Sequence, residues 1–118
     1  MTELYAEELR VRDKGRLLVV RFHEGDAYDI PAELLRVESP SAEVQGHGPG
    51  QEVLVTGKAA VTIVGIEAVG SYAVKLIFSD GHDTGLYTWP YLAHLGRNRD
   101  SLMADYERRL AQAGQSRG

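Results

Sequence analysis

The sequence predicts an α+β fold: a small antiparallel sheet rich in β-hairpins, with a short helix after the first hairpin and helices at the C-terminal end. Three observations predict this class. Runs of β-branched and aromatic residues alternate with short turns that contain Gly or Asp, a pattern typical of hairpins. Pro31 opens a short apolar segment and suits a first helical turn, where its missing N–H has no helical partner. The last part of the chain spaces its apolar residues as a helix does.

Strand composition occurs three times in the first half of the chain, in residues 9–12, 17–22 and 27–30. The last two segments are separated by a polar turn in which Gly25 can adopt a positive φ at low cost, so they should pair as a hairpin. In the helix that begins near Pro31, Leu34 and Leu35 would dock on the sheet. Arg36 lies at the end of this helix, where its side chain can pair with the C-terminal carbonyls of the helix.

The second half contains three more segments of strand composition, namely residues 61–69, 72–78 and 86–87. Gly70 and Ser71 join the first two of these segments as a hairpin. Thr88 can cap a helix that runs to Leu95, and Gly96 is its expected stop.

A final helix is expected from about Asp100, and Gly114 should end it. The apolar stripe of this helix consists of Leu102, Met103, Tyr106 and Leu110. We expect a single domain over residues 1–114 and a frayed tail at residues 115–118.

Residues 37–58 lack regular periodicity and are rich in Gly, Pro and Ser, so they predict a long loop with one short strand at residues 53–55. A loop of this length in a small domain is often functional. The segment Gly46–Gly50 resembles a phosphate loop only superficially. It lacks the Lys-Ser/Thr that opens the helix of such a loop, and Pro49 removes a backbone donor. We therefore reject a nucleotide site there.

Composition and charge restrict the function classes. The 118 residues, of which 43% are hydrophobic and 25% charged, are typical of one soluble domain. The net charge of -4 argues against nucleic-acid binding, which needs a basic face. No apolar run reaches the about 20 residues that span a membrane, and the acidic start of the chain does not resemble a signal peptide. We expect a cytoplasmic protein that contacts neither nucleic acid nor membrane.

The chain contains no cysteine, which excludes disulfides, thiolate metal sites and cysteine nucleophiles. Serines and histidines are present, but no Gly-x-Ser-x-Gly elbow or similar signature places a serine beside a base. Serines in turns of this kind more often bond their own backbone. We therefore predict that the protein is not an enzyme and has no catalytic residues of its own.

The turn between residues 79 and 85 contains the most interesting polar side chains. Asp80, His82 and Asp83 could together hold a cation, although Asp side chains in such a turn also cap backbone N–H groups without a metal. Tyr87 and Trp89 could form an aromatic recognition surface beside His82, but aromatic rings more often pack the core. The candidate interaction surface consists of Arg36, His47, Asp80, His82, Tyr87 and Trp89.

Three blocks of sequence resemble a known family. They are residues 30–36 (IPAELLR), 39–43 (SPSAE) and 80–92 (DGHDTGLYTWPYL). In order and spacing they are similar to the γ-butyrobetaine hydroxylase-like N-terminal domain, from about Leu9 to Leu110. The family includes bacterial proteins of unknown function, the N-terminal domains of carnitine-pathway oxygenases, and domains appended to P-loop iron–sulfur carriers. The oxygenase chemistry lies in a separate jelly-roll domain that this chain does not contain.

The resemblance also implies what has changed. In the oxygenases this domain holds a structural zinc ion through a Cys-x-Cys-x-x-Cys run and a later histidine. The run falls on Ser39, Ser41 and Val44, and the histidine on His82. Hydroxyl groups are poor zinc ligands and valine is not a ligand, so the resemblance implies that the family zinc is lost.

These observations favour a non-catalytic accessory or binding module that acts through protein contacts, with any link to iron–sulfur or oxygenase systems resting on the family alone. A second hypothesis is a metal-binding protein that uses His82 with His47 and nearby carboxylates. A third is a small enzyme with a site around Asp80, His82, Tyr87 and Arg36. The chain could also form a homodimer, because a small sheet often leaves an edge strand available for pairing.

Overall fold

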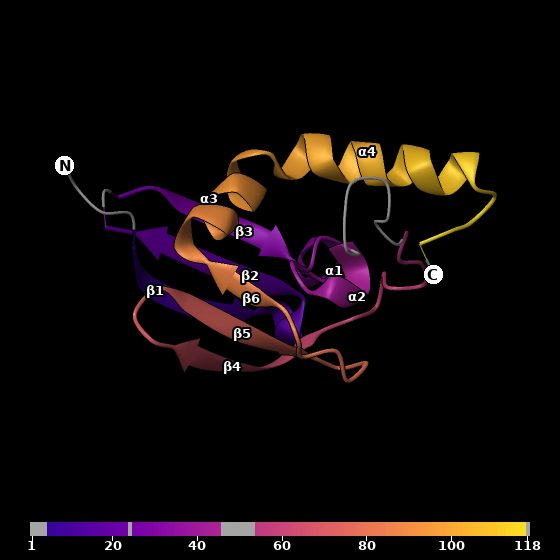
Figure 1. Ribbon diagram of the computed structural model, residues 1–118. Coiled ribbons are helices and arrows are strands. Elements are labelled where there is room, and N and C mark those ends of the chain that lie inside the picture. The colour runs from indigo at the N-terminus through magenta and orange to yellow at the C-terminus, as the bar shows by residue number, and fades with distance from the viewer. Residues whose placement is uncertain (1–4, 24, 46–53, 118) are drawn as a thin grey trace.

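The computed structural model describes residues 5–23, 25–45 and 54–117 (Figure 1). Its strands are β1 (Ala6–Arg12), β2 (Leu17–Phe22), β3 (Ala27–Pro31), β4 (Ile63–Val69), β5 (Ala73–Phe78) and β6 (Leu86–Thr88). Its helices are the 3-10 turn η1 (Asp13–Gly15), α1 (Ala32–Val37), α2 (Ala42–Gln45), α3 (Trp89–Arg97) and α4 (Arg99–Gln112). The α+β class is confirmed. The strands of the described residues form two antiparallel sheets, however, ordered β1-β2-β3 and β4-β5-β6, instead of the single sheet that was expected.

In the first sheet, alternate residues of β2 face the core. Leu18, Val20 and Phe22 are at most 1% exposed, whereas Arg21 between them is exposed. Leu18 is paired with Ile30 of β3 in antiparallel register. This period of two is what the β-branched run predicts for a sheet with one buried face.

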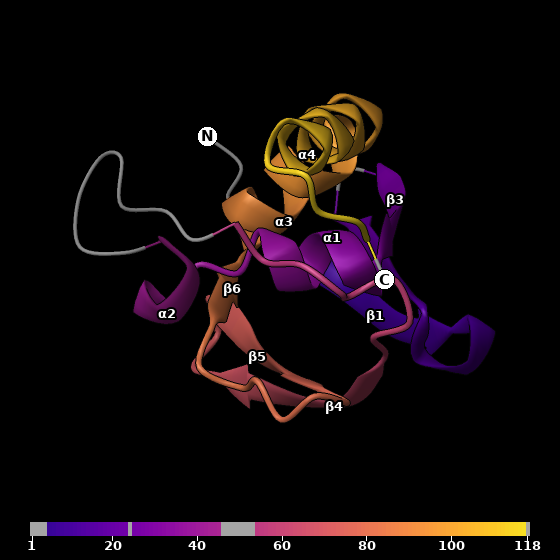
Figure 2. The same cartoon turned by 90° about the vertical axis from the view of Figure 1, so that its right-hand side faces the viewer.

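The second sheet follows the same rule. Val74, Leu76 and Phe78 of β5 are buried, and Gly70 in the turn before β5 has a φ of 54°, which glycine adopts without a steric penalty. In both Figure 1 and Figure 2, α3 and α4 lie on one side of the molecule and β4 and β5 lie on the other. The outer face of this second sheet is therefore not covered by a described helix.

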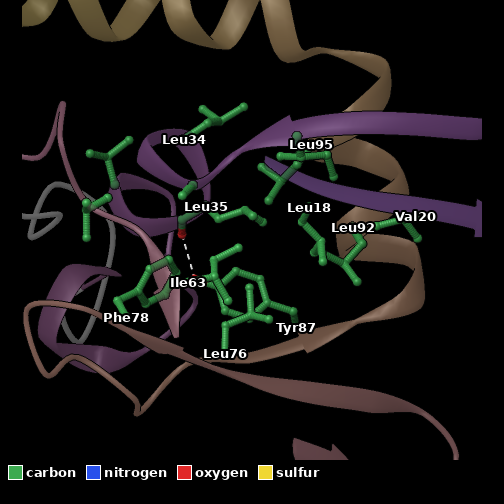
Figure 3. Close-up of a cluster of buried hydrophobic side chains, with 14 of the residues drawn as sticks. Leu18, Val20, Leu34, Leu35, Ile63, Leu76, Phe78, Tyr87, Leu92 and Leu95 are labelled. Carbon is green, nitrogen blue, oxygen red and sulfur yellow. Dashed lines mark hydrogen bonds between the residues drawn. The ribbon is translucent and has the colours of Figure 1, made fainter. Parts of the chain in front are cut away.

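The core lies between the two sheets and the helices, as Figure 3 shows. It includes Leu18 and Val20 from β2, Leu34 and Leu35 from α1, Ile63 from β4, Leu76 and Phe78 from β5, Tyr87 from β6, and Leu92 and Leu95 from α3. Burial of apolar side chains is the main favourable term in folding, so this cluster fixes the positions of the loops around it.

Residues 54 and 55 form no strand, which corrects part of the expected strand at 53–55; residue 53 lies outside the described residues. The Tyr106 hydroxyl of α4 donates to the Val55 carbonyl at 2.6 Å. The backbone of this segment is thus bonded by a side chain instead of a neighbouring strand. In the described residues, no helix is long and apolar enough to cross a membrane.

The expected stop at Gly96 is also corrected, because α3 continues to Arg97 and Asn98 caps it. Gly96 lies inside α3, at a position where close packing leaves no room for a side chain. A Cβ atom at this position would lie 2.5 Å from Cγ of Tyr28, so the ring of this β3 residue packs directly on the helix backbone. Thr88 caps the helix as expected, accepting a hydrogen bond from the Tyr91 N–H.

The close contact at Gly96 predicts that Gly96→Ala destabilises the protein by about 1–3 kcal/mol, the usual cost of overpacking. In a Tyr28→Ala background the same substitution should be neutral or stabilising, because alanine is the better helix former. Urea unfolding of the four proteins of this double-mutant cycle measures the difference. Equal effects of Gly96→Ala in both backgrounds would contradict the contact.

The C-terminal tail, residues 115–117, has no helix or strand, but Arg117 is held in place. Its guanidinium forms a two-pronged ion pair with the buried Glu33 carboxylate of α1, with Nη2 2.6 Å from Oε1 and Nε 3.0 Å from Oε2. The Arg117 carbonyl accepts from the Ala59 N–H at 3.0 Å. The tail is therefore bound to α1 and to the segment before β4.

Arg117→Ala should destabilise the protein by about 1–2 kcal/mol, because it leaves the Glu33 carboxylate buried without this partner. This expected loss of stability is modest for a buried carboxylate, because the Arg117 side chain is 47% exposed. The matched control is Arg108→Ala, whose side chain is 66% exposed and which should change stability by less than about 0.5 kcal/mol. Equal effects in chemical denaturation would show that the ion pair does not hold the tail.

Candidate functional site

The turn after α1 and the loop between β5 and β6 bring three polar side chains together in the interior. The Ser39 hydroxyl lies 2.8 Å from Nε2 of His82, and the Ser41 hydroxyl lies 3.4 Å from the same nitrogen. Ser39 is 0% exposed, Ser41 6% and His82 8%. We call these three residues the His82 cluster.

Local backbone geometry places His82. The Phe78 N–H donates to the His82 carbonyl, and the Gly81 N–H donates to the Phe78 carbonyl, which closes the turn at the end of β5. Gly81 has a φ of 90°, so the turn requires a residue without a Cβ penalty. The turn thereby directs the His82 ring inward, toward the end of α1.

The approach of the two loops also depends on Gly85. A Cβ atom on Gly85 would lie 2.5 Å from the Ser39 hydroxyl oxygen. The β5–β6 loop can therefore contact the Ser39 segment only because residue 85 has no side chain. This is a second position where glycine permits a close approach.

Asp80, two residues before His82, is the centre of an ion-pair cluster. Its Oδ2 lies 2.8 Å from Arg36 Nε and 2.7 Å from Lys58 Nζ, and its Oδ1 accepts from the His82 N–H at 3.1 Å. Burial alone would raise the pKa of Asp80, but the hydrogen bonds from Lys58, His82 and Arg36 outweigh it and hold the pKa well below its usual range. Arg36 thus pairs with Asp80.

Two tyrosines fix the end of α1 to the second half of the chain. The Tyr87 hydroxyl donates to the Leu35 carbonyl at 2.6 Å, and the Tyr91 hydroxyl donates to the Glu38 carbonyl. Burial raises the pKa of Tyr87 above its usual range and that of Tyr91 to about 12, so both hydroxyls remain protonated donors at neutral pH. Two carbonyls at the C-terminal end of α1 are thereby satisfied.

The candidate residues from the sequence fall into separate groups. Arg36, Asp80 and His82 are neighbours, but His82 and the fully buried Tyr87 lie in the interior and so cannot form a recognition surface. Trp89 lies elsewhere and donates from Nε1 to the Ser71 carbonyl at 2.9 Å. His47 lies outside the described residues. Of the two rings expected on this surface, Tyr87 is instead buried in the core, whereas Trp89 is half-buried and packs against the core.

Lys58 and Tyr91 also contact this region, and sequence reasoning did not single them out. Lys58 comes from the loop before β4 and pairs with Asp80 from the turn after β5. A cavity of about 240 Å³ lies beside this pair and is also lined by Gly57, Ala60, Val61 and Ser79. A second one, of about 410 Å³, lies at residues 96–101. Neither is lined by the His82 cluster.

The arrangement of the His82 cluster fits a structural role better than a catalytic one. A serine next to a histidine can act as a nucleophile only if a substrate can reach it. Ser39 is fully buried, and its carbonyl accepts from the Gln45 side chain at 2.8 Å. The cluster therefore joins the end of α1 to the β5–β6 loop.

Comparisons with known proteins place the chain in a family. Residues 9–93 match the family model described as γ-butyrobetaine hydroxylase-like, N-terminal. The chain belongs to this family. No match was found among curated proteins.

Solved structures are similar to most of this chain. Two proteins solved by NMR in solution share 50% and 47% identity, cover 98% and 99% of this chain and 91% and 90% of their own, and have a TM-score of 0.84. A protein of unknown function of the DUF971 family from Acidithiobacillus ferrooxidans is 40% identical. It covers 77% of this chain and 91% of its own, with a TM-score of 0.63.

The positions that the resemblance assigns to zinc ligands lie together only in part. Ser39 and Ser41 contact His82, and Val44 of α2 is 4% exposed. One imidazole, two hydroxyls and an isopropyl group do not fit zinc, which favours thiolates and imidazoles. Among the residues that the structure describes, no three His, Cys, Asp or Glu side chains are grouped to hold a metal ion. The four positions that the resemblance assigns to zinc ligands are thus occupied here by the His82 cluster and the buried Val44.

Proposed function

We propose that this protein is a non-catalytic binding module that acts through protein contacts, and that the contact surface is the outer side of the β4-β5-β6 sheet. One observation carries the proposal. Val64, Tyr72 and Leu86, which are large apolar residues of this sheet and its turn, are 64%, 55% and 42% exposed. We call these three residues the β4–β6 surface. The helices α3 and α4 lie on the opposite side of the molecule (Figure 2).

The distribution of polar groups supports this proposal. Among the candidate side chains that the structure describes, the His82 cluster is turned inward and Asp80 is already paired. The apolar side chains on the β4–β6 surface have no such internal role. Aromatic residues such as Tyr72 are enriched in protein interfaces because they bury a large rigid area at a low entropic cost.

The test is photo-crosslinking in the living cell. A photoreactive p-benzoylphenylalanine at position 72 should give discrete adducts with another protein. The same group at Asp100 on α4, where the side chain is 92% exposed, should not. Equal adducts from both positions, or none from position 72, would overturn the proposal.

A purified partner identified in this way allows a quantitative test. Tyr72→Ala should weaken its binding about 30-fold, the effect of removing an aromatic anchor of about 2 kcal/mol. Asp100→Ala is the matched control and should leave the affinity unchanged. Retained affinity of Tyr72→Ala would place the contact elsewhere.

A further inference from the structure

The two sheets have four edge strands among the described residues, namely β1, β3, β4 and β6. An edge strand presents unpaired N–H and C=O groups to any other strand. Proteins usually protect such edges with charged residues, prolines, short strands or a covering helix. The four edges differ in how far they are protected in this way.

Three edges carry recognisable protection. The β1 edge contains charged residues along its length: Glu7, Glu8, Arg10 and Arg12. The β3 edge ends in Pro31 and packs against α3, where the Tyr28 ring meets Gly96. The β6 edge is only three residues long and leads directly into α3.

The β4 edge is different. Of its seven residues, IVGIEAV, Glu67 alone is charged, and this carboxylate is paired with Lys75 Nζ of β5 at 2.9 Å. Val64 and Ala68 are exposed. An irregularity in register between Ile63 and Gly65 disturbs the start of the strand. On the regular part from Gly65 to Val69, none of the described strands pairs with the outer edge.

We propose that β4 pairs antiparallel with β4 of a second copy of this chain, so that the two β4-β5-β6 sheets become one continuous sheet. The charge pattern favours a second copy of this chain as the partner. Glu67, the one charged residue of β4, is already paired with Lys75, so an acidic or basic strand would find no free counter-charge on β4. A two-fold axis at Ile66 sets Glu67 opposite Gly65 of the other copy, within the regular part of the strand. No like charges then face each other across the pair.

This inference rests on the proposed function only in taking the same sheet as the contact surface. The pairing of one short strand buries less than the about 1,200 Å² of stable complexes. The association is therefore weak and depends on concentration, in the range of micromolar to millimolar dissociation constants.

Sedimentation equilibrium of the full chain from about 10 μM to about 1 mM tests the pairing. We expect a reversible monomer–dimer equilibrium, and hydrogen exchange at the β4 amides that do not bond β5 should slow as concentration rises. Ala68→Lys introduces a natural edge-protecting residue and should weaken dimerisation at least tenfold. The control is Val11→Lys on β1, also an exposed edge position, which should dimerise like the original protein.

A monomer at every concentration, or equal weakening by both lysine variants, would overturn the pairing. A monomer that still gives adducts with another protein at position 72 would overturn this inference and leave the proposed function standing. An adduct at position 72 with the mass of two chains, lost in Ala68→Lys, supports the pairing.

Discussion

The triple variant Ser39→Cys, Ser41→Cys, Val44→Cys is expected to bind one zinc ion per chain together with His82. The positions already converge, since both serine hydroxyls lie within 3.4 Å of His82 Nε2. A sulfur and a nitrogen on the same tetrahedral zinc ion lie about 3.5 Å apart, given the usual bond lengths. Small shifts of the Ser39 turn therefore suffice to bring sulfur atoms at positions 39 and 41 onto a zinc ion held by His82.

The expected effect of this variant is large. Structural zinc sites have apparent binding free energies of about 10–16 kcal/mol at neutral pH, and binding to the folded state alone raises stability. The zinc-loaded variant should therefore melt well above its chelator-treated form. Elemental analysis of protein purified without chelators should read one zinc per chain for the variant and close to none for the original sequence.

The contribution of His82 is isolated by adding His82→Ala to the triple variant, which should weaken zinc binding by at least tenfold. A triple variant that folds but takes up no zinc would show that the His82 cluster does not preserve the geometry of the family site. One zinc per chain in the original protein would instead favour the metal-binding hypothesis, with ligands outside those described.

Asp80→Asn is expected to destabilise the protein by about 3 kcal/mol, which corresponds to a melting temperature lower by about 10 °C. The substitution leaves Arg36 and Lys58 without their counter-charge, although the side chains are only 12% and 23% exposed. Within the described residues, Arg36 Nη1 is already buried without a hydrogen-bond partner. Removal of the Asp80 charge would leave this guanidinium still less well paired, which lowers the stability of the folded state.

The effect depends on pH with a definite sign. The pKa of Asp80 is depressed in the folded state from an ordinary value of 3.8, so its stabilisation is fully present above that value. It is lost as the pH falls below 3.8, because the unfolded chain then binds a proton that the folded chain does not. The difference between the original protein and Asp80→Asn should shrink between about pH 5 and about pH 2.

Asp83→Asn is the matched control, since Asp83 lies on the same loop and is exposed. It should change stability by less than about 0.5 kcal/mol. Thermal unfolding followed by circular dichroism at several pH values measures all three proteins. An equal loss in both variants, or a difference that does not depend on pH, would contradict the proposed role of the Asp80 ion pairs.

The sequence allowed the elements to be predicted wherever local chemistry determines them. The β-branched run of β2, the glycine turn before β3 and the Thr88 cap are local signals, and the structure confirms each of them. The division into two sheets could not be predicted, because it depends on how two similar meanders pack together. Gly96 was assigned to a helix stop because a glycine in a sequence does not reveal the ring that approaches it.

The candidate site was predicted only in part for the same reason. The spacing of Ser39 and Ser41 relative to His82 has no meaning without the family resemblance, because the pairs are 43 and 41 residues apart. No sequence signal links Lys58 to Asp80. The β4–β6 surface also required the structure, because Val64 lies in an apolar strand and only its exposure distinguishes it from a core residue.

The hydrogen bond from Tyr87 to the Leu35 carbonyl has a consequence for the order of folding. It joins residues 52 positions apart, whereas the β1-β2-β3 and β4-β5-β6 meanders each pair strands that are neighbours in the chain. Contacts between distant residues bear a larger loop-closure entropy and tend to form after local ones. Loss of this bond in Tyr87→Phe should therefore mainly speed unfolding and hardly slow refolding, so that the lifetime of the native state depends on the junction between the two meanders.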